Sequence, residues 1–273
     1  IFGLASVGAL LLILSLVIFG EEEAFKEEVK VEVKEAPGLD ETKIKKLFDR
    51  AEAELKSGLP QEAIKTLNKA LKISPEQPVG HLLLGHAKFL AEDRAGAMKS
   101  YEQALVYDKT LAQDVRLGSH LEEGLKWTAS REKAAGILAE FGGKKGIELL
   151  AEKANSALSD GEEREVARIA LIGVDREEEI DWLASLTADF NEYKTCKKRK
   201  KIIAQMEQTA NPAFLPLLEA QKIKKKKRKK SFIDRFRKRD GQKLKRCIAE
   251  DVERAIKTLS GMEEKKEKET KKP

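Results

Sequence analysis

Two consecutive segments of thirty-four residues share one pattern of small positions, and this repeat limits the possible folds more than any other feature of the chain. Shifting the sequence by thirty-four residues brings 44–77 onto 78–111. Small residues then match at two places, Ala51 with Gly85 and Ala63 with Ala97. Small side chains let two helix backbones approach closely. Each copy is therefore predicted to be a pair of antiparallel helices that buries its apolar face against the next pair.

The residues around these positions resemble the tetratricopeptide repeat family. The stretches QEAI (61–64) and KALKISP (69–75) carry the resemblance, together with the bulky Leu67 and Tyr101, which match in the same register. The chain departs from the family pattern at Glu54, where a large residue is usual, and at Lys109, where proline is expected. The resemblance covers 44–111 and implies stacked helix pairs that bind a protein partner in a concave groove.

In that family the groove is lined by the first helix of each unit. Carried over to this chain, the resemblance implies a mostly apolar groove with a charged rim, and the predicted partner-binding residues are Lys45, Phe48, Glu52, Lys56, Leu82, His86 and Phe89. The alternative is that some of these side chains pack against a neighbouring helix. The Lys and Asn arrangement with which some members bind an acidic C-terminal peptide is lacking.

The rest of the chain also favours helices. The chain is 41% hydrophobic, 37% charged and only 5% aromatic, which is typical of solvated amphipathic helices. Leucine spacing predicts a capping helix that completes a domain at 44–130. Apolar spacing then predicts helices at 132–141, 145–158, 162–172, 177–187, 197–208, 212–222 and 242–259.

Asn211-Pro212 followed by Phe214 and Leu215 resembles the start of a HEAT-type repeat. We therefore expect an all-α fold, in which a tetratricopeptide-like superhelix continues into HEAT-like helical pairs over 131–260. A plain helical bundle is the alternative for that second part.

The first twenty residues contain no charged side chain, so 1–20 is predicted to be a transmembrane helix, with a signal peptide as the alternative. An acidic linker follows at 21–43. Because Glu21, Glu22 and Glu23 come directly after the span rather than Lys or Arg, the bulk of the chain is predicted to lie outside the cytoplasm. The arrangement resembles that of bacterial membrane-anchored repeat proteins, which implies the inner membrane.

A basic segment dominates the charge of the chain. Residues 222–246 hold fifteen Lys and Arg against two Asp, a net charge of +13 in a chain whose total is +6. A field this concentrated attracts phosphate polymers, acidic lipid headgroups or nucleic acid. The candidate anion-binding residues are Lys224, Lys225, Lys226, Lys227, Arg228, Lys229, Lys230, Arg235 and Arg237. The alternative is a solvated insertion, and the tail at 261–273 is predicted to be disordered.

The sequence offers little for catalysis. Its two cysteines, Cys196 and Cys247, are predicted to be small buried thiols rather than a disulfide, and three histidines without a Cys/His cluster indicate no metal site. The carboxylates are spaced to pair with lysines along helices. We therefore expect no enzyme, cofactor, metal or small-molecule substrate, and we expect a scaffold that binds protein, with anion binding by the basic segment as the alternative.

Overall fold

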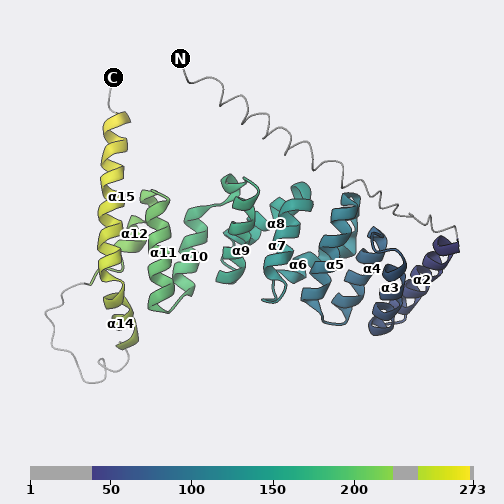
Figure 1. Ribbon diagram of the computed structural model, residues 1–273. Helices are drawn as coiled ribbons and strands as arrows, with labels where there is room; N and C mark the ends of the chain where they lie inside the picture. Colours follow the sequence, from purple (N-terminus) through teal and green to yellow (C-terminus); the bar gives the residue numbers. More distant parts are fainter. Residues whose placement is uncertain (1–38, 224–238, 271–273) are drawn as a thin grey trace, which may run out of the picture. The chain divides into compact units, whose positions relative to one another are not determined.

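A computed structural model describes residues 39–223 and 239–270, and every regular element in these ranges is a helix (Figure 1). The predicted all-α class is confirmed for this part of the chain. No helix within it is long and apolar enough to cross a bilayer. The predicted transmembrane helix at 1–20 lies outside the described residues. The chain divides into two units, Ile1–Thr42 and Lys43–Pro273, and the description below concerns the second.

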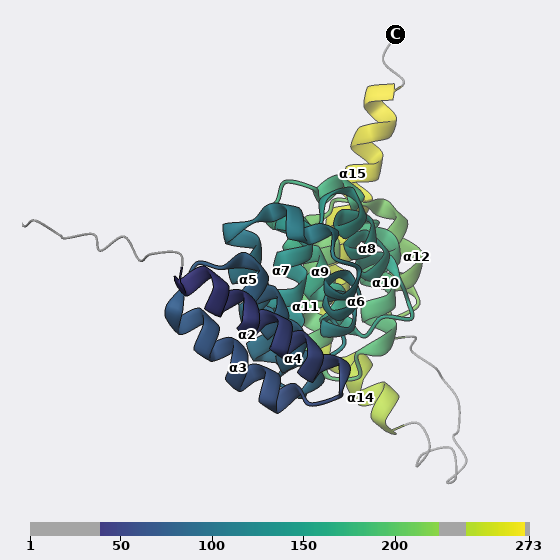
Figure 2. The ribbon, with the colours of Figure 1, turned by 90° about the vertical axis from the view of Figure 1, so that its right-hand side faces the viewer.

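The two repeat copies form two helix pairs. The first copy gives α2 (Leu39–Lys56) and α3 (Pro60–Ile73), and the second gives α4 (Pro78–Leu90) and α5 (Arg94–Tyr107). Figure 2 shows α2, α3 and α4 side by side. Gly58 has a φ of +69°, which suits the turn between α2 and α3. Prolines begin α3 and α4, where a missing N–H costs nothing, so the sequence itself fixes these helix starts.

The small residues lie where the repeat predicts. Ala51, Ala63 and Ala97 have no exposed surface, as expected of side chains enclosed by a helix–helix contact. Gly85 faces the ring of Tyr101 so closely that a Cβ atom would overlap it. The close approach of paired helices is thus confirmed at these positions.

The middle of the chain continues with short helices. A 3₁₀ turn, η1 (Lys109–Gln113), leads to α6 (Val115–Gly124), where the capping helix was expected. Then come α7 (Arg131–Phe141), α8 (Gly143–Asn155) and α9 (Gly161–Gly173), each within a few residues of its predicted bounds. One hydrophobic core runs from α4 through α9. The core therefore continues past residue 130, where we expect a boundary between two domains.

The C-terminal part differs from the prediction at three places. Instead of a helix at 177–187, a 3₁₀ turn (η2, Glu177–Glu179) precedes α10 (Trp182–Glu192), because Asp181 caps α10 by accepting from the Ala184 N–H at 3.0 Å. After α11 (Cys196–Gln208), η3 (Pro212–Phe214) and α12 (Leu215–Glu219), the expected helix at 242–259 is divided into α14 (Arg239–Cys247) and α15 (Ala249–Thr270). α15 also continues through most of the segment where we expect disorder.

Two further clusters complete the interior. α2, α3 and α4 share a small core around Ala51, Ala63 and Leu67. The helices from α10 to α15 share another, which contains Phe190, Phe214 and Val252. From α3 to α10 each helix packs mainly on elements close to it in the sequence, as in repeat proteins, whereas α15 packs on both α11 and α12.

Candidate functional site

A cavity of about 340 Å³ lies between three helices of the repeat region. It is at the small end of the range for ligand pockets. We call it the three-helix pocket, and it is lined by Glu52, Leu55 and Lys56 of α2, His86 and Leu90 of α4, and Arg116 and His120 of α6. Two leucines give it an apolar wall, and the 54% exposure of Leu90 leaves that wall open to solvent.

The lining repeats with the period of the sequence. Glu52 and His86 are thirty-four residues apart, and so are His86 and His120. Lys56 and Leu90 are related by the same interval. Five of the seven lining residues therefore occupy two registers of the repeat, one of which extends over three successive helical units. The third unit lacks the small-residue pattern, but its His120 still lies at the position equivalent to Glu52 and His86.

Two of the lining residues belong to a hydrogen-bonded group, which we call the His–Tyr–His cluster: His86, Tyr101 and His120. The Tyr101 hydroxyl is 2.9 Å from His86 Nδ1 and 2.5 Å from His120 Nδ1. The two Nδ1 atoms are 3.4 Å apart. His120 also stacks on Phe89, with 3.9 Å between ring centroids. Because Gly85 has no side chain, the Tyr101 ring can lie against α4 and reach both imidazoles.

One tyrosine hydroxyl forms a hydrogen bond with each of the two imidazoles. The hydroxyl can donate to one Nδ1 while accepting from the N–H of the other, so the cluster is satisfied with two neutral histidines in different tautomers. His86 Nε2 forms no hydrogen bond although His86 is 1% exposed, and it lies 3.4 Å from Asp114 Oδ1. That oxygen already accepts from the Leu117 N–H at 2.8 Å and so caps the start of α6.

Burial sets the protonation of the cluster. Desolvation, followed by the positive charge of Arg116, lowers the pKa of His86 to about 4 despite the opposing effect of Asp114. Burial also lowers the pKa of His120 and raises that of Tyr101. All three side chains are therefore neutral near pH 7.

Only some of the predicted groove residues line the three-helix pocket. Glu52, Lys56 and His86 line the pocket, whereas Leu82 and Phe89 are buried in the main core, at 6% and 7% exposure. Phe48 packs on the core of α2 to α4, and Lys45 is exposed.

Arg116 and His120 were not predicted. His120 is the ninth residue of a third copy beginning at Ala112, but that copy has Arg131 where a small residue is expected, so the sequence predicts a capping helix there and no groove residue.

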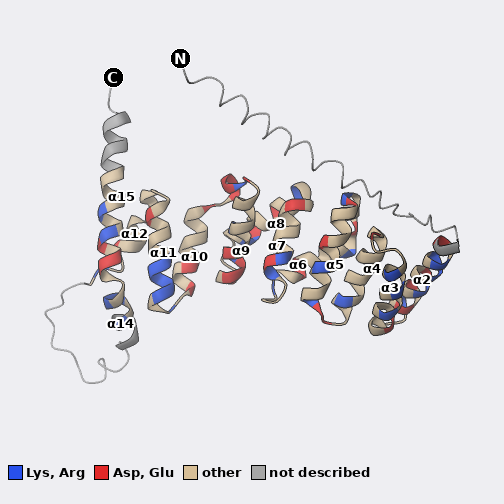
Figure 3. Cartoon of the chain, in the orientation of Figure 1, with Lys and Arg blue, Asp and Glu red and all other residues tan. Residues whose placement is uncertain are grey.

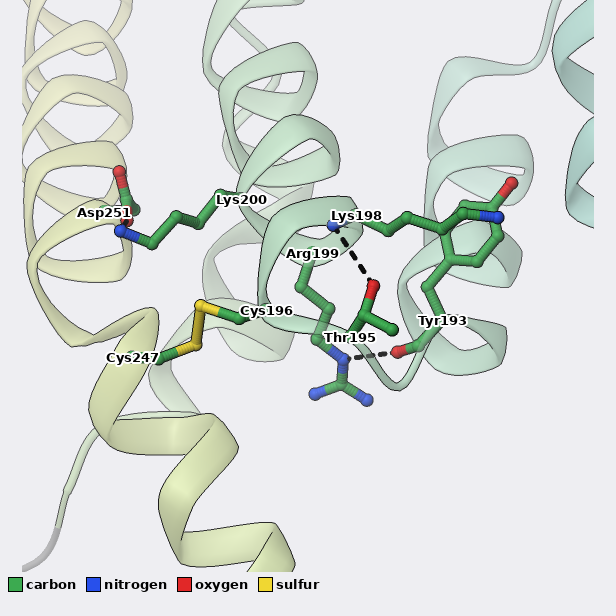
Figure 4. The surroundings of a disulfide bond; sticks show 8 residues. All are labelled: Tyr193, Thr195, Cys196, Lys198, Arg199, Lys200, Cys247 and Asp251. Carbon is green, nitrogen blue, oxygen red and sulfur yellow. Dashed lines mark hydrogen bonds and ion pairs between the residues drawn. A yellow bond between two sulfur atoms is a disulfide. The ribbon is translucent and has the colours of Figure 1, made fainter.

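The two cysteines form a disulfide, so the prediction of two buried thiols was wrong (Figure 4). Cys196 is the first residue of α11 and Cys247 the last of α14, with Cα atoms 6.2 Å apart. Both cysteines are partly buried against the core, which fits the apolar spacing that suggested thiols. Fifty-one positions separate them in the sequence, so only the packing of α15 on α11 brings them together.

The predicted anion-binding residues, from Lys224 to Arg237, lie outside the described part of the chain. The structure does describe the residues on either side of this basic segment. Lys245 Nζ donates to the Ala220 carbonyl at 2.8 Å, and the disulfide holds Cys247 beside α11.

α11 begins with five consecutive cations, which appear as blue bands on that helix in Figure 3. Three of them form ion pairs with neighbouring helices: Lys198 with Glu162, Lys201 with Glu165 and Lys200 with Asp251. The cations of α11 thus connect it to α9 and α15, and much of its charge is already neutralised.

The described residues contain no group of three or more His, Cys, Asp or Glu side chains placed to hold a metal ion. No protein family model, curated protein or solved structure matches the chain. Two other cavities, of about 420 and 460 Å³, are larger but contain none of the predicted groove residues, so the three-helix pocket is the candidate site.

Proposed function

We propose that this chain is an interaction scaffold that binds a segment of a partner protein in the three-helix pocket. The supporting observation is the repetition of the lining, with Glu52, His86 and His120 contributed by one register of three successive units. Stacked helical units create extended binding surfaces in this way. The exposed leucine wall provides apolar area, and Lys56 and Arg116 provide charge at the rim.

Binding fits the pocket better than catalysis does. The His86 imidazole and the Tyr101 ring are almost completely buried, and the hydroxyl is already bonded to both histidines. General acid–base catalysis needs a group within hydrogen-bond reach of the substrate. His120 alone of the cluster lines the pocket with appreciable exposure, so a non-enzymatic role is part of the proposal.

The proposal includes a tether to the membrane through 1–20, with the helical part on the outer face of a bacterial inner membrane. The disulfide supports that side, since such bonds persist in oxidising compartments and are rare in the cytosol. Thiol-blocking of intact cells followed by reduction and a second label would test it. The proposal requires both cysteines to be protected until reduction, and labelling of both before reduction would contradict it.

Partner capture tests the pocket itself. Leu90→Asp places a charge on the apolar wall, and Arg116→Glu reverses a charge at the rim. Each substitution should lower the recovery of a specific partner at least tenfold in affinity purification from native membranes. Val106→Asp is the matched control, because Val106 is 58% exposed and lies outside the lining. Equal recovery with all three variants would contradict the proposal.

A second candidate function is binding of a polyanion by the basic segment. The observation that favours it is the fixing of both ends of that segment, through Lys245 on Ala220 and the disulfide. Counterion release makes such binding fall steeply with salt, whereas capture by the pocket should survive moderate salt. Neutralising 224–230 and repeating the purification at two salt concentrations separates the two functions.

A further inference from the structure

Three arginines occur at related places in three helices of the C-terminal half. Arg131 begins α7, whereas Arg164 and Arg199 are the fourth residues of α9 and α11. Each of the three side chains donates to a backbone carbonyl of the chain just before its own helix: Arg131 Nε to Leu125 at 2.6 Å, Arg164 Nη1 to Ser159, and Arg199 Nε to Tyr193 at 2.8 Å. The three guanidinium groups are therefore anchored in a similar way.

Two of these arginines also bind carboxylates from a later part of the chain. Arg131 Nη2 donates to Asp160 at 2.9 Å, and its Nη1 donates to Glu162 at 3.3 Å, where α9 begins. Arg164 Nη2 donates to Glu192, the last residue of α10. In this half of the chain an anchored arginine thus receives a carboxylate from the helix that follows.

Arg199 differs, because no carboxylate in the described part of the chain pairs with it. Its guanidinium carbon lies 4.4 Å from the centroid of the Phe190 ring, and only its Nε atom donates a hydrogen bond to these residues. In Figure 4 the two terminal nitrogens point away from the other labelled side chains. Arg199 therefore offers the paired N–H groups of one guanidinium edge, a geometry that matches the two oxygens of a carboxylate.

The disulfide brings cations of a second helix close to this arginine. On α11, Arg199 follows Cys196 by three residues, so the two side chains share a helix face. On α14, Lys243 precedes Cys247 by four residues and shares its face in the same way. Because the Cα atoms of the two cysteines are 6.2 Å apart, each cation lies about one helical turn from the bridge.

The exposed charge beside the bridge is mainly positive. Lys197 and Arg246 adjoin the two cysteines, and together with Lys243 they are exposed and form no ion pair within 39–223 and 239–270. Asp251, in the first turn of α15, is already paired with Lys200 at 3.2 Å. The cations beside the bridge are therefore available to an external anion. We call Arg199 and these three cations the Arg199 surface.

We propose that the Arg199 surface is a docking site for an acidic segment of a partner protein. One carboxylate of that segment pairs with Arg199, as Glu192 pairs with Arg164, and the three exposed cations attract the acidic residues on either side of it. A phosphate polymer is the rival anion, but the two comparable arginines hold carboxylates. The surface is separate from the three-helix pocket, whose lining belongs to α2, α4 and α6.

Fluorescence anisotropy with a labelled peptide of alternating Glu and Ser tests the docking site. The chain used has the Lys and Arg of 224–230 replaced by Gln, so that these cations do not bind the probe. In that background Arg199→Ala should raise the Kd about tenfold, because it removes a charge-assisted pair. Arg199→Lys should restore only part of the affinity, since an ammonium group lacks the two-pronged geometry of a guanidinium.

Two further variants make the test independent of any change in folding. Lys243→Glu/Arg246→Glu alters exposed side chains alone and should also raise the Kd about tenfold, because it reverses two charges of the surface. Lys72→Ala is the matched control, since Lys72 is exposed on α3 and forms no ion pair with the described residues. It should leave the Kd unchanged.

Four outcomes would overturn the proposal. They are no binding of the peptide, the same Kd for Arg199→Ala and Lys72→Ala, full recovery in Arg199→Lys, and no effect of the α14 double variant. Titration with polyphosphate distinguishes the rival anion. The loss caused by Arg199→Ala should be larger for the peptide, and an equal or larger loss for polyphosphate would also overturn the proposal. Leu90→Asp should not change peptide binding, so failure of this surface is distinguishable from failure of the three-helix pocket.

Discussion

His86 and His120 stand thirty-four residues apart and direct their Nδ1 atoms at the same tyrosine hydroxyl, that of Tyr101. The interval is the period of the sequence repeat, so the two histidines occupy equivalent places in neighbouring units. One hydrogen-bonded cluster thereby joins two units at the three-helix pocket. The cluster depends on Gly85, on its burial and on the position of α6.

Gly85→Ala should destabilise the fold. A Cβ atom at this position would overlap the Tyr101 ring, and overpacking of this kind costs about 1–3 kcal/mol. Urea denaturation followed by circular dichroism measures the change. Gly118→Ala is the control, since a Cβ there has no heavy atom within 4 Å and alanine favours a helix interior. A neutral or stabilising Gly85→Ala would show that the ring does not lie against α4.

Stability should fall as the solution becomes mildly acidic. The pKa of His86 is lowered to about 4 from an ordinary 6.5, so the unfolded chain binds more protons than the folded chain between these values. The stabilisation linked to neutral His86 is complete above pH 6.5 and is lost as the pH falls toward 4. The total loss in the free energy of unfolding is roughly 3 kcal/mol. The free energy of unfolding should decline more steeply from pH 6.5 to 5.5 in the wild type than in His86→Gln. Identical slopes would contradict this.

Asp189→Ala should be among the most damaging substitutions in the chain. This buried carboxylate accepts from Arg164 Nε at 2.6 Å and from Arg168 Nη2 at 2.7 Å, and both arginines are buried. Its removal leaves buried Arg168 without an ion-pair partner and Arg164 with Glu192 alone, and breaking a buried pair in this way costs about 3–5 kcal/mol. Glu102→Ala breaks the exposed pair with Lys133 and should cost less than about 1 kcal/mol. Similar losses in chemical denaturation would contradict the burial of this network.

Reduction of the disulfide should lower stability without unfolding the C-terminal core. The disulfide joins residues fifty-one positions apart, and a bond of this kind adds about 2–4 kcal/mol to the free energy of unfolding. Val252, Ala255 and Leu259 of α15 are buried in the C-terminal core, and this packing should persist after the bond is cleaved. A reductant should therefore lower the urea midpoint of the wild type and leave Cys247→Ser unchanged. Two reactive thiols in the unreduced protein would contradict the bond.

The repeat allowed much of the N-terminal fold to be predicted from sequence. Small residues in register are a local signal, so the two helix pairs and the burial of Ala63 and Ala97 followed directly. α10 was misplaced because the acidic run at 177–179 is typical of a helix start, whereas Asp181 is the residue that caps it. The difference lies in backbone geometry that composition does not specify.

Long-range partners could not be predicted in the same way. Arg164 is spaced like a surface residue, yet it is buried because Asp189, twenty-five residues away, compensates its charge. The two cysteines meet only because α15 packs on α11, and no local sequence pattern indicates that packing. Within the pocket, Glu52, Lys56 and His86 followed from the family resemblance. Arg116 and His120 required the position of α6.

The most direct measurement is site-specific photo-crosslinking in native membranes, with a photoreactive amino acid replacing Leu90 in the pocket and, in a parallel chain, Val106 outside it. Both side chains are more than half exposed, at 54% and 58%, so they differ chiefly in position. The account predicts one discrete adduct from position 90 at pH 7.5, absent from position 106 and lost when Arg116→Glu is added. Equal adducts from both positions, or an adduct at 90 that survives the charge reversal, would contradict partner binding in the three-helix pocket.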